Sequence, residues 1–543
     1  MKNSYTLLFL LLLSSTLFAQ QTSFTRQDSL RGSLNKNRGW WDVLKYDLTT
    51  TPDYSSKTIK GSNIILFKVT KPGHLMQIDF QQPMQIDSVV WQSRLLVLKR
   101  DGDTYLADFE KDLDVGSTTS LRIVFSGKPR EAKMPPWDGG WIWAKDQKGR
   151  PWMSVACQGL GASVWYPCKD HQSDEPDQGA SISITVPDSL VAVSNGKLIS
   201  TKVKNGLAVY TWSVTNPINN YNIIPYIGKY VHWDETFSGE NGNLSCDYWV
   251  LDYELEKAKA QFQQVPKMLK CFEHWFGPYP FYEDGFKLVQ SPHLGMEHQS
   301  AVAYGNKFGN GYLGRDLSQT GWGLKWDFII VHESGHEWFG NSITTNDLAD
   351  MWVHEGFTNY SETLFTTCEY GVEAGNDYLI GTRKLVANDI PIIATYGVNR
   401  EGSGDMYYKG GNLVHTIRQV IRDDEKFRQL LRDVNKTFWH QTVTSQQIES
   451  YISQQSGINF SKTFDQYLRT TKIPALEYKI HKNKLQYRWT NCVSGFDLPL
   501  KIEWHGEHWI KPTEAWTTLK GPKGGSNQFL PDRNFFITTK MAD

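Results

Sequence analysis

The sequence predicts a multidomain α+β protein. We expect an N-terminal antiparallel β domain of saddle or sandwich type, a mainly helical middle domain and a small C-terminal β-sandwich. The chain has 543 residues, too many for one hydrophobic core. Strand-like patterns dominate residues 22–250 and 476–543, whereas helical patterns dominate residues 251–475.

Residues 1–19 have the pattern of a signal peptide. Lys2 gives the charged start, Thr6 to Leu13 is an apolar run too short to span a bilayer, and Ala19 is a plausible cleavage residue. No later stretch is long and apolar enough to cross a membrane. We therefore expect a soluble exported protein, either periplasmic or secreted.

The charge balance limits the classes of partner that the sequence predicts, and the cysteine spacing limits the metal and redox sites. Lys+Arg is 57 against Asp+Glu 58, so no basic surplus favours nucleic acid or an anionic membrane. None of the six cysteines is spaced like a zinc knuckle or a redox CxxC pair. One or two disulfides of unknown pairing and free buried thiols both stay open, as does the oligomeric state.

The N-terminal region reads as sheet. Ile64–Val69 has the pattern of a buried strand, and Ser181–Val186 alternates with period two. Residues 156–177 form a long irregular segment that contains Gln158. Composition alone favours a structural loop there over a binding loop.

Helical patterns begin near residue 255. Apolar residues step by three and four from Leu255 to Phe276, which predicts one helix that Pro266 kinks and Gly277 ends. A strand at 286–290 and a loop at 293–298 follow. Helical patterns then continue to about residue 470, and from about residue 476 the strand pattern returns.

The chemistry centres on His332-Glu333-Ser334-Gly335-His336, an HExxH motif. Two histidines four apart on a helix face the same side and can bind one metal ion, with Glu333 placed to hold a water. Apolar residues on both sides indicate a buried helix rather than a surface helix with two ordinary histidines. Glu355, 19 residues after His336, is the candidate third ligand on a returning helix.

This spacing resembles the zinc signature of the M1 family of metallo-aminopeptidases, which are gluzincins. Three further motifs appear in the family's order between residues 40 and 475. They are Gln158 in Cys-Gln-Gly, Gly295-Met296-Glu297 of the exopeptidase loop, and Tyr407-Tyr408-Lys409-Gly410. The resemblance implies a thermolysin-like catalytic domain.

The resemblance also implies roles for these residues in an exported, zinc-dependent aminopeptidase. One Zn²⁺ would be held by His332, His336 and Glu355. Glu333 would act as general base and acid, and Tyr407 would stabilise the oxyanion. Glu297 would bind the free α-amine of the peptide, with Gln158, Gly295 and Met296 beside it. Tyr408 and Lys409 are interpreted as structural.

Four positions depart from the family's pattern. Leu294 and His298 replace the first Gly and the last Asn of the exopeptidase loop, while Glu337 and His354 replace a Gln and an Asn beside the zinc ligands. The first two leave the shape of the first pocket and the preferred N-terminal residue open. A thermolysin-like endopeptidase and an inactive binding scaffold are the alternative functions.

Overall fold

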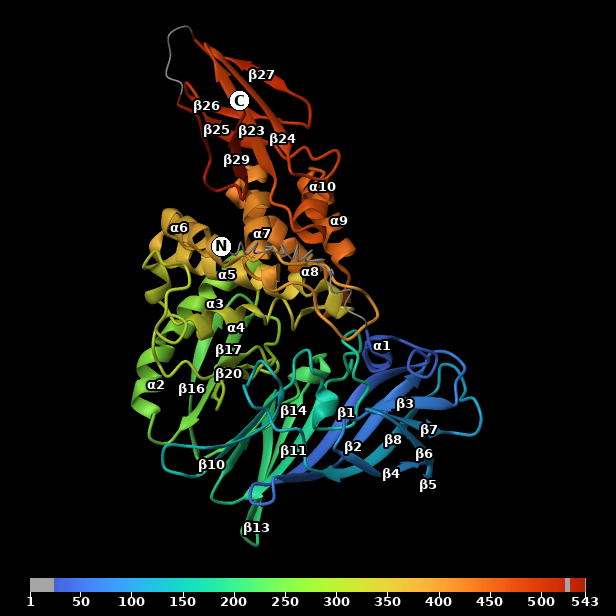
Figure 1. Cartoon of the computed structure of the whole chain (residues 1–543). Coiled ribbons are helices and arrows are strands. Elements are labelled where there is room, and N and C mark those ends of the chain that lie inside the picture. The colour runs from blue at the N-terminus through green and yellow to red at the C-terminus, as the bar shows by residue number, and fades with distance from the viewer. Residues whose placement is uncertain (1–23, 523–527, 543) are drawn as a thin grey trace, which may run out of the picture.

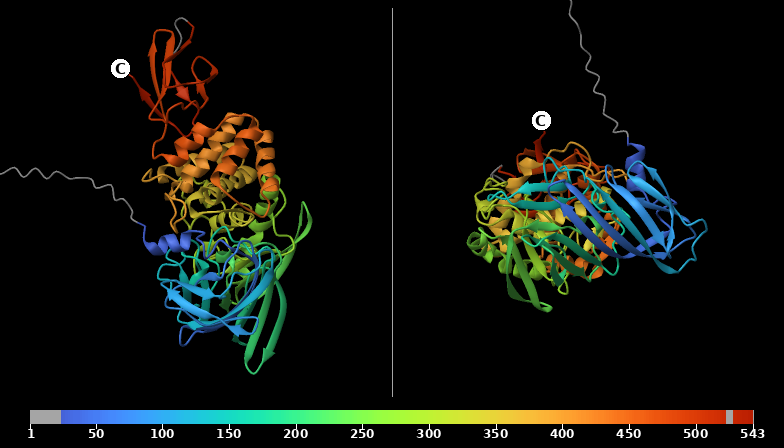
Figure 2. Two further views of the ribbon diagram at one scale, coloured as in Figure 1. Left: turned by 90° about the vertical axis from the view of Figure 1, so that its right-hand side faces the viewer. Right: turned by 90° about the horizontal axis from the view of Figure 1, so that it is seen from below.

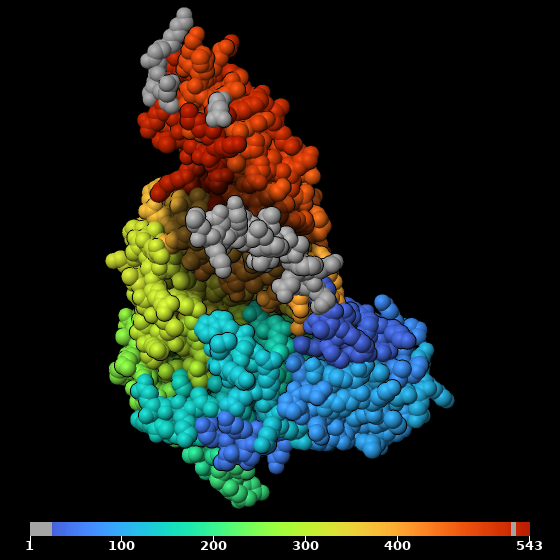
Figure 3. All heavy atoms as spheres, viewed as in Figure 1, coloured from blue at the N-terminus to red at the C-terminus, as the bar shows by residue number. Residues whose placement is uncertain are grey.

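The computed structural model describes residues 24–522 and 528–542. The predicted signal peptide at residues 1–19 lies outside these residues. Three parts follow one another along the molecule, with the N-terminal β domain at one end and the C-terminal β unit at the other (Figure 1). The left view of Figure 2 and the space-filling view in Figure 3 show the same elongated arrangement.

The N-terminal domain begins with helix α1 (Arg26–Gly32) and is otherwise built of strands. Its largest sheet has eight strands, in which β1 and β11 pair in parallel and the other neighbours are antiparallel. In spatial order the strands are β13 (Lys197–Lys204), β14 (Leu207–Val214), β11 (Ala180–Pro187), β1 (Trp41–Asp53), β2 (Thr58–Val69), β8 (Thr118–Gly127), β4 (Gln85–Trp91) and β5 (Arg94–Leu95). The strands predicted at 64–69 and 181–186 lie within β2 and β11.

Two smaller sheets complete this domain. One contains β12 (Val191–Val193), β15 (Tyr226–Gly228), β10 (Pro151–Ala156) and β9 (Gly140–Lys145). The other contains β3 (Leu75–Asp79), β7 (Thr104–Asp108) and β6 (Val97–Asp101). Alternating side chains of these sheets fill one hydrophobic core.

The middle domain combines one mixed sheet with helices. Its sheet order is β16 (Tyr230–Gly239), β17 (Gly242–Leu251), β18 (Phe286–Gln290), β20 (Val302–Tyr304) and β19 (Gly295–Met296). The helices are α2 (Leu255–Gln261), α3 (Val265–Phe276), α4 (Phe328–Gly335), α5 (Trp352–Tyr370), α6 (Val372–Thr382), α7 (Tyr408–Ile421), α8 (Asp424–Thr437), α9 (Ser445–Ser456) and α10 (Ser461–Arg469). A short parallel pair, β21 (Ile343–Thr345) and β22 (Gln441–Val443), lies between them.

The change of sheet comes earlier than the predicted boundary at residue 250. Strands β16 and β17 precede that residue, yet β17 pairs with β18 of the helical domain. The middle domain therefore begins near Tyr230. The predicted boundary lies where helical patterns begin. A strand's sequence pattern shows that it is buried on one face but does not show which sheet it joins, so the prediction places β16 and β17 in the N-terminal domain.

The helix predicted over 255–276 is divided. A 3₁₀ turn at Phe262–Gln264 separates α2 from α3, and Pro266 occupies the first turn of α3. Proline is tolerated there because the first N–H groups of a helix have no intrahelical partner. Gly277 ends α3 as predicted, with a positive φ of 95°.

The C-terminal unit is a small sandwich of two sheets. One contains β27 (Thr517–Lys520), β24 (Lys484–Thr490), β23 (Ala475–His481) and β29 (Thr538–Met541), and the other β26 (Glu507–Ile510), β25 (Leu500–Glu503) and β28 (Leu530–Pro531). The predicted fold class is confirmed. Within the described ranges, no helix combines the length and apolarity needed to cross a membrane.

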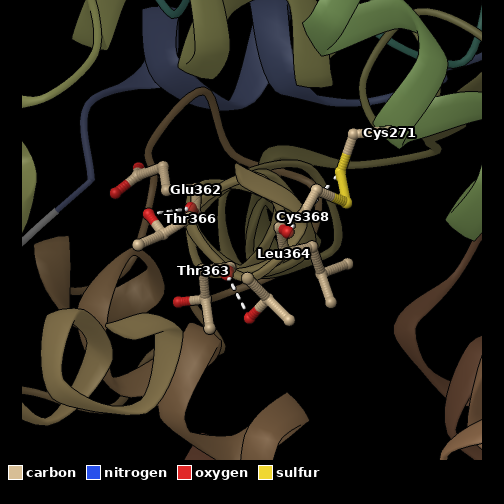
Figure 4. The surroundings of a disulfide bond; sticks show 7 residues. Cys271, Glu362, Thr363, Leu364, Thr366 and Cys368 are labelled. Atoms are coloured by element: carbon tan, nitrogen blue, oxygen red, sulfur yellow. Dashed lines mark hydrogen bonds between the residues drawn. A yellow bond between two sulfur atoms is a disulfide. The ribbon is translucent and has the colours of Figure 1, made fainter. Parts of the chain in front are cut away.

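One disulfide joins two helices of the middle domain. Cys271 on α3 is bonded to Cys368 near the end of α5, across 97 residues of sequence (Figure 4). Three of the other cysteines, Cys157, Cys168 and Cys246, are buried free thiols. Both possibilities that the sequence left open are therefore present in this chain.

Candidate active site

Helix α4 carries the HExxH motif through the centre of the middle domain. Asp327 caps its start, because the carboxylate accepts hydrogen bonds from the N–H groups of Ile329 and Ile330. The same carboxylate accepts from Tyr304 at 2.7 Å and from Asn306 at 2.7 Å. This network fixes the helix start one turn before His332.

The two histidines and Glu355 converge. The Nε2 atoms of His332 and His336 lie 3.8 and 3.3 Å from Oε2 of Glu355. All three side chains are buried. Burial alone would raise the pKa of Glu355, but the neighbouring imidazoles outweigh it and hold that pKa below its usual range.

Other groups orient both imidazole rings from behind. Nδ1 of His332 lies 2.7 Å from Oε1 of Glu362, and Nδ1 of His336 lies 3.0 Å from the carbonyl oxygen of Phe339. Both partners accept hydrogen bonds, so each ring presents Nε2 to the cluster. A buried carboxylate or carbonyl behind a histidine is the usual arrangement around a protein-bound metal.

The donor set fits a divalent metal ion such as zinc. Two imidazole nitrogens and one carboxylate oxygen face one point, with room for a fourth ligand on the cleft side. Oε2 of Glu355 is buried and has no hydrogen-bond partner among the described residues. Leaving a buried carboxylate oxygen unpaired costs free energy, and a metal cation bound between this oxygen and the two imidazole nitrogens would remove that cost.

Glu333 lies in the cleft beside this cluster. Burial raises its pKa to about 7, against the opposing charges of His332 and His336. Gly295 on β19 lies directly against it, because a Cβ at Gly295 would come within 2.6 Å of Oε1 of Glu333. Only glycine leaves the backbone of β19 this close to the carboxylate.

Glu297 occupies the same cleft from a different element. Its Oε1 accepts a hydrogen bond of 3.0 Å from the Tyr221 hydroxyl, and its backbone carbonyl accepts one of 2.7 Å from Asn341. Ligating atoms of Glu297, Glu333 and His336 all lie within 4.8 Å of one another. The carboxylate predicted to bind an amine is thus adjacent to the predicted base.

The remaining predicted site residues line the same cleft. The cleft has a volume of about 540 Å³. Its lining includes Gln158 of the N-terminal domain, Met296 of β19, and Tyr407, which directly precedes α7. Burial, with the carboxylates of Glu355, Glu401 and Glu297, raises the pKa of Tyr407 well above its usual value. The Tyr407 hydroxyl therefore stays protonated and can donate a hydrogen bond.

Helices α5 and α7 touch through two glycines next to these residues. A Cβ at Gly410 would come within 2.9 Å of the Cα of Gly356. Gly356 follows Glu355 directly, and Gly410 comes three residues after Tyr407. The backbone contact therefore brings these two side chains from separate helices to one cleft.

Three of the four departures from the family pattern point away from the cleft. His298 is buried against the hydroxyl of Tyr226, Glu337 accepts from the Ser300 N–H at 2.9 Å, and His354 accepts from the Thr345 N–H at 2.8 Å. Leu294 is the fourth, and it does line the cleft.

The sequence reasoning missed several cleft residues. Glu362 lies seven residues after Glu355, two turns along α5, so helical spacing could have identified it. Glu401 comes from a loop, and Tyr221, which donates to Glu297 from behind the cleft, comes from the 3₁₀ turn at Asn220–Asn222; neither carries a local signal. Tyr408, interpreted as structural, also lines the cleft, whereas Nζ of Lys409 donates to the carbonyl of Thr470.

Two family models match the chain in order. The Peptidase M1 N-terminal domain matches residues 43–221, and the Peptidase family M1 domain matches residues 260–467. A variant of an M1 zinc metallopeptidase from Deinococcus radiodurans, solved with a Tyr-Ser-Ala substrate, is similar in structure. Its TM-score is 0.65 at 21% identity, over 79% of this chain and 94% of that chain.

Curated relatives are similar at comparable identity. Leukotriene A-4 hydrolase from Xenopus laevis is 23% identical over 69% of this chain, and aminopeptidase B from Rattus norvegicus is 24% identical over 56%. The chain spans only 60% and 46% of their lengths. Both family models lie over the two domains that build the cleft, so the chain belongs to peptidase family M1.

Proposed function

We propose that this protein is a zinc-dependent aminopeptidase that removes single residues from the free N-terminus of peptides. His332, His336 and Glu355 are the proposed zinc ligands, because their donor atoms converge and no described residue hydrogen-bonds to Oε2 of Glu355. When bound, zinc supplies a Lewis acid that polarises the scissile carbonyl and lowers the pKa of a water.

The chain's own residues carry the proton transfers. Glu333 takes a proton from the attacking water and delivers it to the leaving amine. Its carboxylate is buried in the cleft beside the proposed ligands, where it can hold a water and exchange a proton with it. Tyr407 donates a hydrogen bond to the carbonyl oxygen as negative charge develops there.

One observation carries the choice of an aminopeptidase over an endopeptidase. The carboxylate of Glu297 lies within 4.8 Å of Glu333 and His336 at the buried side of the cleft. A carboxylate there binds a free ammonium by charge-assisted hydrogen bonds, with Oε1 of Gln158 available as a further acceptor. An internal peptide segment would instead leave the Glu297 carboxylate buried and unpaired.

Blocked and free peptides test this proposal directly. We expect the purified, zinc-loaded enzyme to hydrolyse aminoacyl-arylamides and to release residues one at a time from a free peptide. N-acetylated forms of the same substrates should stay intact. Efficient cleavage of the acetylated peptides would instead establish an endopeptidase, and a zinc-loaded protein that cleaves neither would favour a binding scaffold.

Glu362 should tune zinc affinity through the His332 ring that it holds. Its carboxylate holds Nδ1 of His332 and is itself held by Tyr378 at 2.6 Å. We expect Glu362→Gln to weaken zinc binding roughly 10- to 100-fold, as measured by competition with a chelator. Glu369→Gln, two turns further along α5 and paired with Lys267 at the surface, is the matched control. Unchanged zinc affinity in Glu362→Gln would remove this role.

Export to an oxidising compartment is part of the proposal. The signal-peptide pattern at residues 1–19 supports it, and so does the disulfide between Cys271 and Cys368, because such bonds persist outside the cytosol. Fractionation of the source cells, with N-terminal sequencing of the mature protein, tests it. We expect a first residue near position 20. Recovery of the chain in the cytosol with Met1 intact would contradict export.

A further inference from the structure

Glu401 is a cleft carboxylate for which the proposed reaction has no use. It lies in the loop before α7, six residues ahead of Tyr407, and lines the cleft together with Gln158 and Glu297. Its side chain reaches toward the N-terminal domain, where a Cβ at Gly159 would come within 3.2 Å of its Oε1. In the part of the chain that the structure describes, Glu401 has no hydrogen-bond or ion-pair partner.

The lining of the cleft contains more carboxylates than the proposed reaction uses. Its lining contains no lysine or arginine but five glutamates: Glu297, Glu333, Glu355, Glu362 and Glu401. Four of these have a proposed partner. In the order just given, Glu297 to Glu362 would bind the α-amine, the water, the metal and the His332 ring. Glu401 alone has neither a partner among the described residues nor a role in the proposed reaction.

The surroundings of Glu401 favour a cationic partner. Burial raises its pKa to about 7, and the carboxylates of Glu355 and Glu297 add to this effect. A bound ammonium or guanidinium would relieve both penalties at once. The α-amine is already provided for by Glu297 and Gln158, so the partner of Glu401 must come from another part of the substrate.

The cleft also suits the apolar part of a long basic side chain. Met296, Tyr408 and Phe328 line it, and they can pack against methylene groups while the charged end reaches a carboxylate. A guanidinium can pair with both oxygens of one carboxylate, which gives selectivity as well as affinity.

We propose that Glu401 selects arginine or lysine as the N-terminal residue of the substrate. This inference rests on the aminopeptidase function proposed above. It makes Glu401 a specificity-determining residue that contacts the substrate side chain and takes no part in the proton transfers.

Substrates of equal shape and different charge test the proposal. Citrulline has the shape of arginine without its charge, so the two aminoacyl-arylamides isolate the electrostatic contribution. We expect the wild-type enzyme to favour arginine over citrulline roughly 10- to 100-fold in kcat/KM. Glu401→Gln should bring the two values within about threefold of each other, because it replaces the carboxylate by a neutral group of the same size.

Controls separate this role from its alternatives. Glu401→Asp should keep part of the preference. Glu373→Gln, which removes an exposed carboxylate of α6 paired with Arg533, should keep all of it. Melting temperatures of the variants check that they fold.

Three results would overturn the inference. One is a wild-type arginine-to-citrulline ratio near one, which needs no variant to measure. Another is an unchanged ratio in Glu401→Gln. The third is an equal loss for arginine, citrulline and leucine substrates, which would assign Glu401 to the α-amine. In all three the aminopeptidase function stands, whereas hydrolysis of no aminoacyl substrate at all would remove both proposals together.

Discussion

Glu333→Ala is expected to reduce kcat roughly 100- to 10,000-fold and to leave one zinc ion bound per chain. General acid–base catalysis contributes a factor of this size, and Glu333 is the carboxylate placed to supply it. Glu333 is not one of the three proposed zinc ligands, His332, His336 and Glu355, whose donor atoms converge without it. Turnover of an unblocked aminoacyl-arylamide and metal analysis of the same sample measure the two quantities separately.

A matched control lies four residues along the chain. Glu337→Gln removes a second buried carboxylate of the same region, but Glu337 points away from the cleft and accepts from the Ser300 N–H, which glutamine can also do. We expect this variant to keep its activity. Loss of zinc from Glu333→Ala would mean that Glu333 is a ligand, and retained turnover would mean that another group is the base.

Glu297→Ala is expected to lower kcat/KM roughly 100- to 5,000-fold, mainly through KM. Its removal leaves the substrate ammonium in a buried site without its carboxylate, and breaking a buried ion pair costs about 3–5 kcal/mol. Inhibitors that carry a free amine should weaken in parallel, and the zinc content should stay normal. Steady-state kinetics with unblocked substrates and inhibition by amine-bearing compounds give both readouts.

Two comparisons make the Glu297 result specific. Tyr221→Phe removes only the hydroxyl that donates to Glu297 at 3.0 Å, so we expect a much smaller loss in that variant. N-acetylated substrates lack the ammonium and should be poor for wild type and variant alike. If Glu297→Ala affected all substrates through kcat alone, its carboxylate would be acting on the chemistry and not on the amine.

The zinc cluster was predictable because its information is local. His332 and His336 are one helical turn apart, and Glu355 follows in the first turn of the next α-helix, α5. Glu362 obeys the same helical spacing and was within reach of the same reasoning. Glu297 and Tyr407 were reached through motif resemblance, since neither has a periodic relation to the zinc motif.

Features that depend on contacts between distant segments could not be read from the sequence. Tyr221 reaches Glu297 from 76 residues away, and Cys271 meets Cys368 across 97 residues. Glu401 lies in a loop, where side-chain direction follows no period. The assignment of β16 and β17 to the middle domain has the same cause, because a strand pattern shows which face is buried and not which strand is its neighbour.

The contact between Gly356 and Gly410 gives a structural reason for the glycine that ends the Tyr-x-Lys-Gly motif. Because the two backbones touch at these glycines, the contact sets the distance between Tyr407, the proposed oxyanion donor, and Glu355, a proposed metal ligand. A single methyl group added at either position would push the two helices apart and move Tyr407 relative to Glu355, although every side chain of the cleft would still be present. Part of this enzyme's catalytic precision therefore resides in side chains that are absent, which a search for reactive residues would pass over.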